Sequence, residues 1–455
     1  MIAPSVTRTP KLPPGPRYPR ALSTLGWITR PMPFMERCQQ RYGDIFTLRV
    51  AHEGTWVFLA HPDMVKQVFT GDATRLHAGE ANAILEPVVG RHSVLLLDEA
   101  PHMAQRKLML PSFHGERMQR YGDLMRAIAQ EELERWPVGK PVALWPRMQA
   151  ITLEVIMRAV FGISDADRLG RLRQLLADML NLTTAPWEML KLVALGPKRI
   201  QANRGFRATV DPVDDLVRDE IRARRAVDDL SERDDVLSLL LQARHEDGSQ
   251  MSDQELRDEL MTLLVAGHET TATSMAWALE RLMRHPDKLE RLAGELADGS
   301  EEYLDAVIKE TLRLRPVLPI VVRRLTEPLE LGGHLLPAGV SVAPCIHLIH
   351  RRPDIYPEPR RFEPERFLEQ PPGTYTWIPF GGGVRRCLGA SFALYEMKVV
   401  LGEIIGRLRL APARERAERV ARRAITLTPE HGTEAVVVGR RDRVLGAPKA
   451  VGAAA

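Results

Sequence analysis

One cysteine, Cys387, stands between a glycine-rich loop and a helical run, in the string FGGGVRRCLG of residues 380–389. Glycines let the backbone turn sharply and approach a flat ligand, and free N–H groups at a helix start stabilise an anionic sulfur. Arg385 lies two residues before the cysteine. This arrangement indicates a metal-binding thiolate in the site of a cofactor that carries both a cation and acidic arms.

Two other interpretations of the string 380–389 have to be weighed. A single cysteine is more often a small buried hydrophobic residue than a metal ligand. A glycine-rich loop can instead cradle a phosphate, but no Gly-Lys-Ser/Thr follows, and Arg386 stands where a GxGxxG motif needs glycine. Neither alternative accounts for the whole string.

The string resembles the FxxGxRxCxG signature of the cytochrome P450 family, and it matches without departure at Phe380, Gly383, Arg385, Cys387 and Gly389. The resemblance implies that Cys387 is the axial ligand of haem iron, whose electron donation favours O–O bond cleavage. It also implies that Phe380 packs beside the sulfur and that Gly381 and Gly389 lie at the haem. The implied cofactor is haem b, iron protoporphyrin IX.

A second motif, AGHETT at residues 266–271, lies in the middle of a long helical pattern. Gly267 costs about 1 kcal/mol relative to alanine in a helix, so we expect a flat or bulky group to pass close to it. Thr270 is one turn from Ala266 and Gly267 and shares their face. The string resembles the family's [AG]-G-x-[DE]-T-[TS] motif, which implies haem contacts from Ala266 and Gly267 and a proton relay to dioxygen through Glu269 and Thr270.

The alternatives for this motif are a threonine bonded back to its own helix and a glutamate on a solvated face. His268 and Glu269 also suggest a zinc protease, but the HExxH motif needs histidine where the chain has Ala272.

Two further sets of residues fit the same family. Glu310 and Arg313 form an ExxR pair, which alone is most often a solvated ion pair. The resemblance implies that Glu310, Arg313 and Arg366, the arginine of the string FEPERF at 362–367, form an ion network that braces the cysteine loop.

Basic residues for the acidic arms of haem come from three segments. His102 and Arg106 fall on one helical face and can hydrogen-bond a carboxylate, although a surface pair is the more common explanation. The resemblance implies that His102, Arg106 and Arg385 meet the haem propionates together with Arg323, for which the adjacent Arg324 is the alternative.

The elements that position these residues are mostly helices. A capping box at Ser252 and Glu255 begins a helix that runs to His285, and this helix would be roughly 50 Å long. Strand patterns occur at residues 44–60, 329–344 and 424–438, the last with a turn around 429–432, and a helical run follows from 388 to about 408. We therefore predict a mainly α fold with small β-sheets (α+β), the cytochrome P450 fold, with the long helix over the haem.

The composition limits the other possibilities. The 455 residues are 44% hydrophobic and 27% charged with a formal charge of +4, so we expect one domain, residues 1–455, with disordered tails at 1–12 and 445–455. Basic and acidic residues are interspersed, which disfavours nucleic acid. Three cysteines and no signal-peptide or membrane-span pattern predict a cytoplasmic protein, which we expect to be a monomer without a transmembrane anchor.

The resulting functional prediction is a monooxygenase that inserts one oxygen atom of O2 into a hydrophobic small molecule. The chain has neither a dinucleotide motif nor spare cysteines, so NAD(P)H-derived electrons should arrive through a separate ferredoxin or flavodoxin with its reductase. Two alternatives remain open. One is a peroxide-driven peroxygenase of the same fold, and the other is a non-enzymatic haem-thiolate sensor or carrier.

Overall fold

The computed structural model describes residues 10–51, 53–113, 117–163, 165–181 and 197–441. Within them the α-helices are α1 (Arg20–Thr29), α2 (Pro31–Tyr42), α3 (Pro62–Phe69), α4 (Ala78–Ala81), α5 (Glu86–Val89), α6 (Glu99–Met109), α7 (Arg117–Glu134), α8 (Leu144–Ala159), α9 (Ala166–Asn181), α11 (Pro197–Gln201), α12 (Arg204–Arg225), α13 (Val236–Gln242), α14 (Asp253–Met283), α15 (Pro286–Ala297), α16 (Glu302–Leu314), α17 (Ile346–Ile349), α18 (Arg366–Glu369) and α19 (Ala390–Arg407). Short 3-10 turns are η1 (Ala83–Leu85), η2 (Leu110–Phe113) and η3 (Gly383–Arg385).

The strands are β1 (Ile45–Val50), β2 (Gly54–Leu59), β3 (Leu76–His77), β4 (Pro141–Ala143), β5 (Arg323–Leu325), β6 (Leu329–Leu331), β7 (His334–Leu336), β8 (Ser341–Pro344), β9 (Leu408–Pro412), β10 (Val420–Arg423), β11 (Thr426–Pro429) and β12 (Glu434–Arg440). They form a five-stranded sheet in the order β1-β2-β8-β5-β3, a three-stranded sheet β4-β12-β9, and the hairpins β10-β11 and β6-β7. The prediction of a mainly α fold with small sheets is confirmed.

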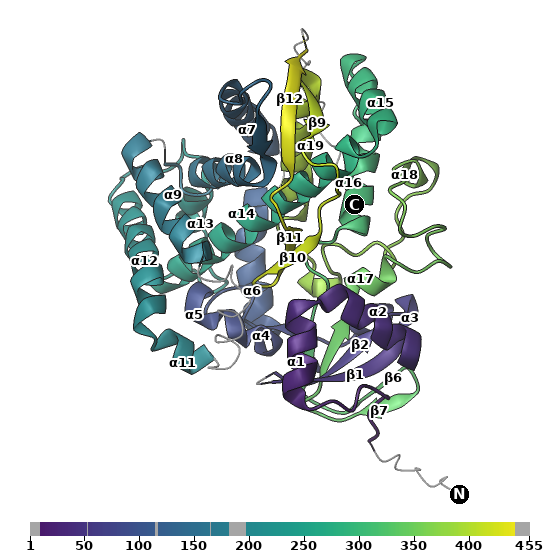
Figure 1. The fold of residues 1–455 in the computed structure, drawn as a ribbon. Coiled ribbons are helices and arrows are strands. Elements are labelled where there is room, and N and C mark those ends of the chain that lie inside the picture. Colours follow the sequence, from purple (N-terminus) through teal and green to yellow (C-terminus); the bar gives the residue numbers. More distant parts are fainter. Residues whose placement is uncertain (1–9, 52, 114–116, 164, 182–196, 442–455) are drawn as a thin grey trace, which may run out of the picture.

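Helix α14 crosses the middle of the fold (Figure 1). Ser252 accepts a hydrogen bond from the Glu255 N–H while the Glu255 carboxylate accepts one from the Ser252 N–H, so the predicted capping box is present. The helix ends at Met283, two residues before the predicted end at His285, and Pro286 begins α15. A helix of 31 residues is about 46 Å long and can carry both ends of a large site.

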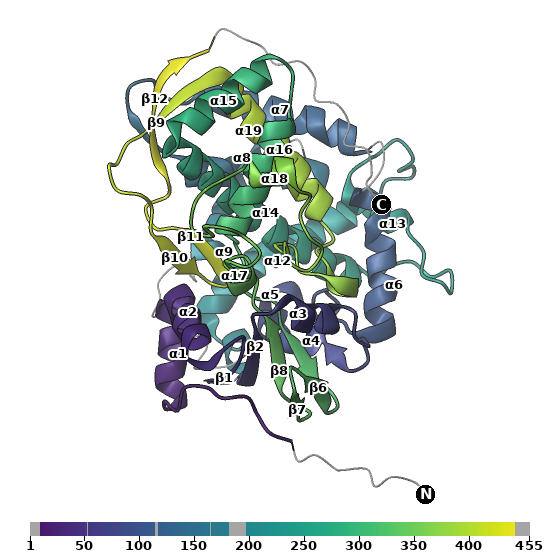
Figure 2. The same cartoon turned by 90° about the vertical axis from the view of Figure 1, so that its right-hand side faces the viewer.

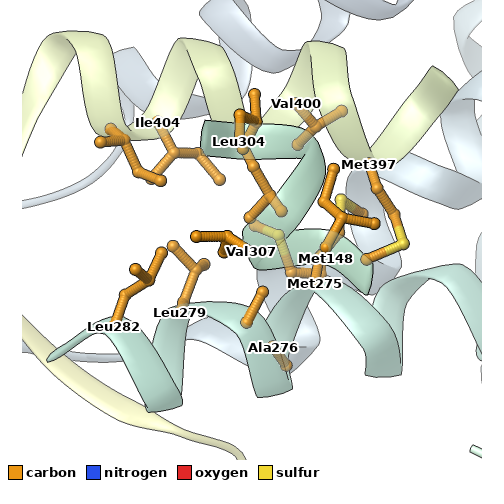
Figure 3. Packing of buried hydrophobic residues seen from close by; sticks show 14 of the residues in the cluster. Met148, Met275, Ala276, Leu279, Leu282, Leu304, Val307, Met397, Val400 and Ile404 are labelled. Carbon is orange, nitrogen blue, oxygen red and sulfur yellow. The ribbon is translucent and has the colours of Figure 1, made fainter. Parts of the chain in front are cut away.

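The largest hydrophobic cluster fixes α14 against its neighbours. Met275, Ala276 and Leu279 of α14 pack toward Leu304 and Val307 of α16 (Figure 3). Figure 3 also shows Met397, Val400 and Ile404 of α19 on the other side of this core. The helix that follows the cysteine is thereby held in a fixed relation to α14, because a closely packed core resists displacement.

The five-stranded sheet lies at one end of the molecule together with α1, α2 and α3, and α7 and α15 lie at the opposite end (Figure 2). The hairpin predicted at residues 44–60 is confirmed as the antiparallel pair β1 and β2. The β6-β7 hairpin turns at Gly332 and Gly333, which both have positive φ.

The strands and the turn predicted within 424–438 are present, and the Gly432 N–H donates to the Pro429 carbonyl at 3.4 Å. The strands on the two sides of this turn do not pair with each other: β11 pairs with β10, whereas β12 pairs with β4 and β9. Lys11, which lies within the tail predicted at 1–12, donates its N–H to the Leu335 carbonyl at 3.2 Å. Residues 1–9 and 442–455, which hold the rest of both expected tails, lie outside the described residues.

No helix in the described ranges combines the length and the apolar composition that crossing a bilayer would require.

Candidate functional site

The cysteine loop is closed by its own backbone. The Cys387 N–H donates to the Phe380 carbonyl at 3.0 Å, and the Arg386 N–H donates to the Gly383 carbonyl at 3.0 Å. The Phe380 ring lies edge-on to Trp377 at 6.2 Å, and the Trp377 indole donates to the Lys309 carbonyl of α16 at 3.1 Å. These bonds hold Cys387 just before α19.

Backbone conformation and steric contacts explain why glycine occupies several positions of this loop. Gly381 and Gly383 have φ angles of +68° and +65°, which strain other residues. A Cβ on Gly383 would lie 2.1 Å from the Phe69 carbonyl oxygen, and one on Gly382 would lie 2.2 Å from the Phe69 ring. At Gly389, by contrast, nothing lies within 4 Å of the Cβ position. Gly382 and Gly383 thus fit the loop against α3, whereas the surroundings of Gly389 leave space for a ligand.

The Cys387 side chain is solvent-accessible although the protein surrounds it. Burial raises the pKa of its thiol, and the Gly389 N–H and the charges of Arg106 and Arg386 oppose this change. From accessibility together with desolvation we infer that the sulfur faces a recess of the protein and not its outer surface. A thiolate here needs one more positive charge nearby, which a metal ion supplies.

The middle of α14 is accessible in the same way. Ala266 is exposed and Thr270 is partly exposed, although most of the surrounding helix is buried. The Thr270 hydroxyl donates to the Ala266 carbonyl at 2.7 Å, so the back-bonded alternative describes its present conformation. The sequence predicted a flat or bulky group beside Gly267. The structure places Ile156 of α8 there, since a Cβ on Gly267 would lie 3.0 Å from its Cδ1. Close packing of α8 against α14 is therefore one reason for this glycine.

Glu269 points toward other elements than Thr270 does. Its Oε2 accepts a hydrogen bond from the Gln149 amide of α8 at 2.9 Å, and its Oε1 lies 3.9 Å from Nε of Arg423 in β10. Burial raises the pKa of Glu269, opposed by the Arg423 charge and the Gln149 bond. The structure therefore does not bring the Glu269 and Thr270 side chains together, and sequence reasoning missed Gln149 and Arg423 because they belong to no motif.

The predicted basic residues converge. His102 is buried, and burial together with Arg385 and Arg106 lowers its pKa to about 4, so it is neutral at pH 7. Arg323 is also buried, and burial and the charge of Arg385 lower its pKa to about 10. Arg324 is only partly buried and pairs in register with His77 of β3. This placement favours Arg323 over Arg324 as a member of the cluster.

Arg385 is directed at a carboxylate of the protein itself. It donates to Oδ1 of Asp98 at 2.5 Å and to the Val94 carbonyl at 3.1 Å, and it also contacts the Leu97 carbonyl. Asp98 in turn accepts the N–H groups of Gly79 and Glu80 at 2.8 and 3.0 Å. The expected contact of Arg385 with an external carboxylate therefore competes with Asp98.

The predicted ion network of Glu310, Arg313 and Arg366 is present, and Glu310 and Arg313 are completely buried. Arg313 donates to both Glu310 oxygens, at 2.6 and 2.9 Å, and Arg366 approaches Glu310 at 3.4 Å. Arg313 also donates to the His350 carbonyl at 2.7 Å, and the His350 ring accepts the Ile378 N–H at 2.9 Å. Because Ile378 lies two residues before Phe380, where the cysteine loop begins, this chain of bonds connects the network to the loop.

The N-terminal half of α14 holds residues 92–94 through hydrogen bonds. The sequence gave no indication of these contacts. Asp258 accepts the His92 N–H at 3.0 Å, and Glu259 accepts the Val94 N–H at 2.7 Å. The Thr262 hydroxyl donates to the Ser93 hydroxyl at 2.7 Å. These bonds position the segment whose carbonyls and Asp98 bind Arg385.

The site fits haem on three observations of this structure. An accessible sulfur that the protein partly desolvates is available for the iron, and open space adjoins Gly389. Three guanidinium groups, from Arg106, Arg323 and Arg385, gather around the neutral His102. Asp98 offsets only part of that charge, so two propionates would be stabilised there.

The comparisons with known proteins agree with this geometry. The family model for cytochrome P450 matches residues 13–434. The chain belongs to the cytochrome P450 family. A cytochrome P450 135B1 of Mycobacterium tuberculosis is 44% identical over 448 residues, which cover 96% of this chain and 94% of that protein. A cytochrome P450 138 of Mycobacterium bovis is 38% identical and covers 96% of this chain and 98% of its own length.

Solved structures of cytochrome P450 proteins share the fold. The retinoic acid-bound cyanobacterial CYP120A1 superposes with a TM-score of 0.81 at 24% identity, covering 94% of this chain and 99% of that one. The cytochrome P450DA haem domain also gives 0.81, at 25% identity, covering 95% and 99%. The chain is thus a cytochrome P450 monooxygenase, an enzyme class that depends on haem and iron.

Proposed function

We propose that this cytochrome P450 binds haem b through Cys387 and inserts one oxygen atom of O2 into a hydrophobic small molecule. The presence of an accessible Cys387 sulfur close to Arg106 of the basic cluster carries this proposal. Bound haem supplies the oxidising chemistry, with the thiolate as electron donor. His102, Arg106, Arg323 and Arg385 would hold the propionates.

The polar residues of α14 would take part in proton transfer. The Thr270 hydroxyl lies on the accessible face with Ala266, where it can hold a water molecule or an oxygen ligand after it leaves the Ala266 carbonyl. Burial raises the pKa of Glu269, and its Oε1 accepts no hydrogen bond from the described residues, so this oxygen is available to accept and release a proton. A rotation away from Gln149 and Arg423 would bring its carboxyl toward Thr270.

Electrons would come from a ferredoxin or flavodoxin with its NAD(P)H-dependent reductase. Helix α6 carries Arg106 and Lys107, and the cysteine loop carries Arg386. Three positive charges in this region suit a partner with an acidic surface. Lys107 already pairs with Glu246 at 3.2 Å, and both side chains are largely exposed. An exposed pair of this kind is weak and can exchange Glu246 for a carboxylate of the partner.

The peroxide-driven alternative has no need of an acid and a threonine on α14, and a sensor or carrier has no need of a proton relay. The buried Glu269 held by Gln149 and Arg423 favours dioxygen chemistry, because burying a carboxyl group costs stability.

Turnover of an identified apolar substrate by wild type and Thr270→Ala tests this choice. With O2 and a redox partner, we expect the variant to release more peroxide and less product, with substrate binding unchanged. Peroxide-supported turnover that matches the partner-supported rate in both proteins would favour the peroxygenase. Substrate binding without any product under either condition would favour the sensor or carrier.

A further inference from the structure

Helix α1 and Tyr18, two residues before it, present apolar side chains to solvent. Tyr18, Leu22 and Leu25 are 55%, 56% and 44% exposed, and these three are among ten large hydrophobic residues exposed in the described ranges. The opposite face of α1 is also occupied, because Trp27 and Ile28 are buried in the core. A helix that is apolar on both faces is expected to bury both, so the outer face of α1 lacks a partner in the described structure.

The same region is strongly basic. Residues 10–51 contain seven basic and two acidic residues, a formal charge of +5 in a chain of +4. Both acids have basic partners from elsewhere: Glu36 binds His347 at 2.9 Å and Arg360 at 2.7 Å, and Asp44 binds Arg352 at 2.7 Å. The excess positive charge of the region is therefore left for an external anionic partner.

The basic side chains surround the apolar ones. Arg37 and Arg41 of α2 line, with Tyr18, a surface pocket of about 470 Å³. Arg17, Arg20 and the two α2 arginines are exposed, and in the described part of the chain they form no ion pair. Helices α1 and α2 lie beside β1 and β2 at one end of the molecule in both views (Figures 1 and 2).

We propose that α1, α2 and residues 16–18, here called the N-terminal basic surface, dock this cytochrome P450 on an anionic membrane. Leucine and tyrosine side chains would enter the interface between headgroups and acyl chains, as they do in amphipathic interfacial helices. The arginines would bind lipid phosphates, with the pocket at Arg37 and Arg41 large enough for a headgroup. Such binding is peripheral and needs no spanning helix.

The test uses the haem-loaded protein and vesicles of phosphatidylcholine, with and without about 30% phosphatidylglycerol, sedimented at about 150 mM salt. We expect binding to the anionic vesicles and roughly tenfold weaker binding to phosphatidylcholine alone. Leu22→Glu/Leu25→Glu and Arg37→Glu/Arg41→Glu should each weaken anionic binding by at least about tenfold.

The matched control is Arg409→Glu/Val438→Glu, which changes an exposed arginine and an exposed valine on β9 and β12. It should bind like wild type, and an unchanged carbon monoxide spectrum shows that every variant is folded. Failure of wild type to sediment with anionic vesicles, or an equal loss in the control, would overturn the proposal. So would a concentration-dependent dimer that Leu22→Glu/Leu25→Glu dissociates, because a second copy would then be the occupant.

Discussion

Glu259 gives a sharp test of the buried charges on α14. The carboxyl group is fully buried, its Oε1 accepts the Val94 N–H at 2.7 Å, and its Oε2 has no hydrogen-bond partner among the described residues. Burial raises its pKa from 4.5 to about 8, against the opposing effects of the Val94 N–H and Gln105. Nearby Asp258 and Glu255 raise it further.

The direction of the pH effect follows from these values. Below pH 4.5 the group is protonated in both folded and unfolded chains and costs nothing. Between pH 4.5 and 8 the unfolded chain loses this proton while the folded chain keeps it, so stability falls as pH rises. The full cost above pH 8 is at most about 5 kcal/mol, since each tenfold change in proton affinity is worth about 1.4 kcal/mol.

Glu259→Gln removes this cost because its amide oxygen can still accept the Val94 N–H and cannot ionise. A chain of 455 residues unfolds with an entropy of about 1 kcal/mol/K, so the variant should melt up to about 5 °C above wild type at pH 9. At pH 5 the two proteins should differ by less than about 1 °C. Differential scanning calorimetry and loss of haem absorbance measure both values.

Asp258→Asn is the matched control for this prediction. Asp258 is equally buried but pairs with Arg257 at 3.0 Å and accepts from His92 and Gln254. Removing the carboxylate that pairs with Arg257 should lower the melting temperature both at pH 5 and at pH 9. A Glu259→Gln variant whose difference from wild type is the same at pH 5 and pH 9 would refute the reasoning.

Three further predictions concern the site. Glu310→Gln leaves Arg313 buried without a full counter-charge and should destabilise the fold by about 3–5 kcal/mol and lower haem content, measured by denaturation and absorbance; an unchanged protein would contradict the bracing role. Gln149→Leu removes a donor to Glu269, so the pKa of that carboxyl should rise further and the pH profile of product formation should move to higher pH, with an unaltered carbon monoxide spectrum. Arg323→Gln should speed haem loss to a scavenger protein roughly tenfold, because a charge-assisted hydrogen bond is worth about 1.5–3 kcal/mol; an unchanged rate would exclude Arg323 as a propionate partner.

The sequence predicted elements whose signals are local. The capping box at Ser252 marked the start of α14, and Pro286 marked the region where α14 ends. The pairing of β12 could not be predicted in this way, because its partner β4 lies about 290 residues earlier in the chain. An alternating strand pattern shows that a strand exists and does not name its neighbour.

The site was predictable to the extent that its residues lie in motifs. Cys387, Glu310 and Arg313 were found by spacing, and the structure places the last two in the ion network that the family resemblance implied. Glu259 and Arg423 carry no such signal, since a single charged residue in a sequence gives no indication of burial. Their roles depend on contacts between α14 and segments far away in the chain.

The most direct measurement is the absorption spectrum of the purified, reduced protein exposed to carbon monoxide, for wild type and Cys387→His. Wild type should show a strongly red-shifted Soret band that the variant lacks, because a thiolate donates electron density to the iron and histidine does not to the same degree. A wild-type protein that binds no haem, or a band that survives the substitution, would contradict the assignment of Cys387 as the axial ligand.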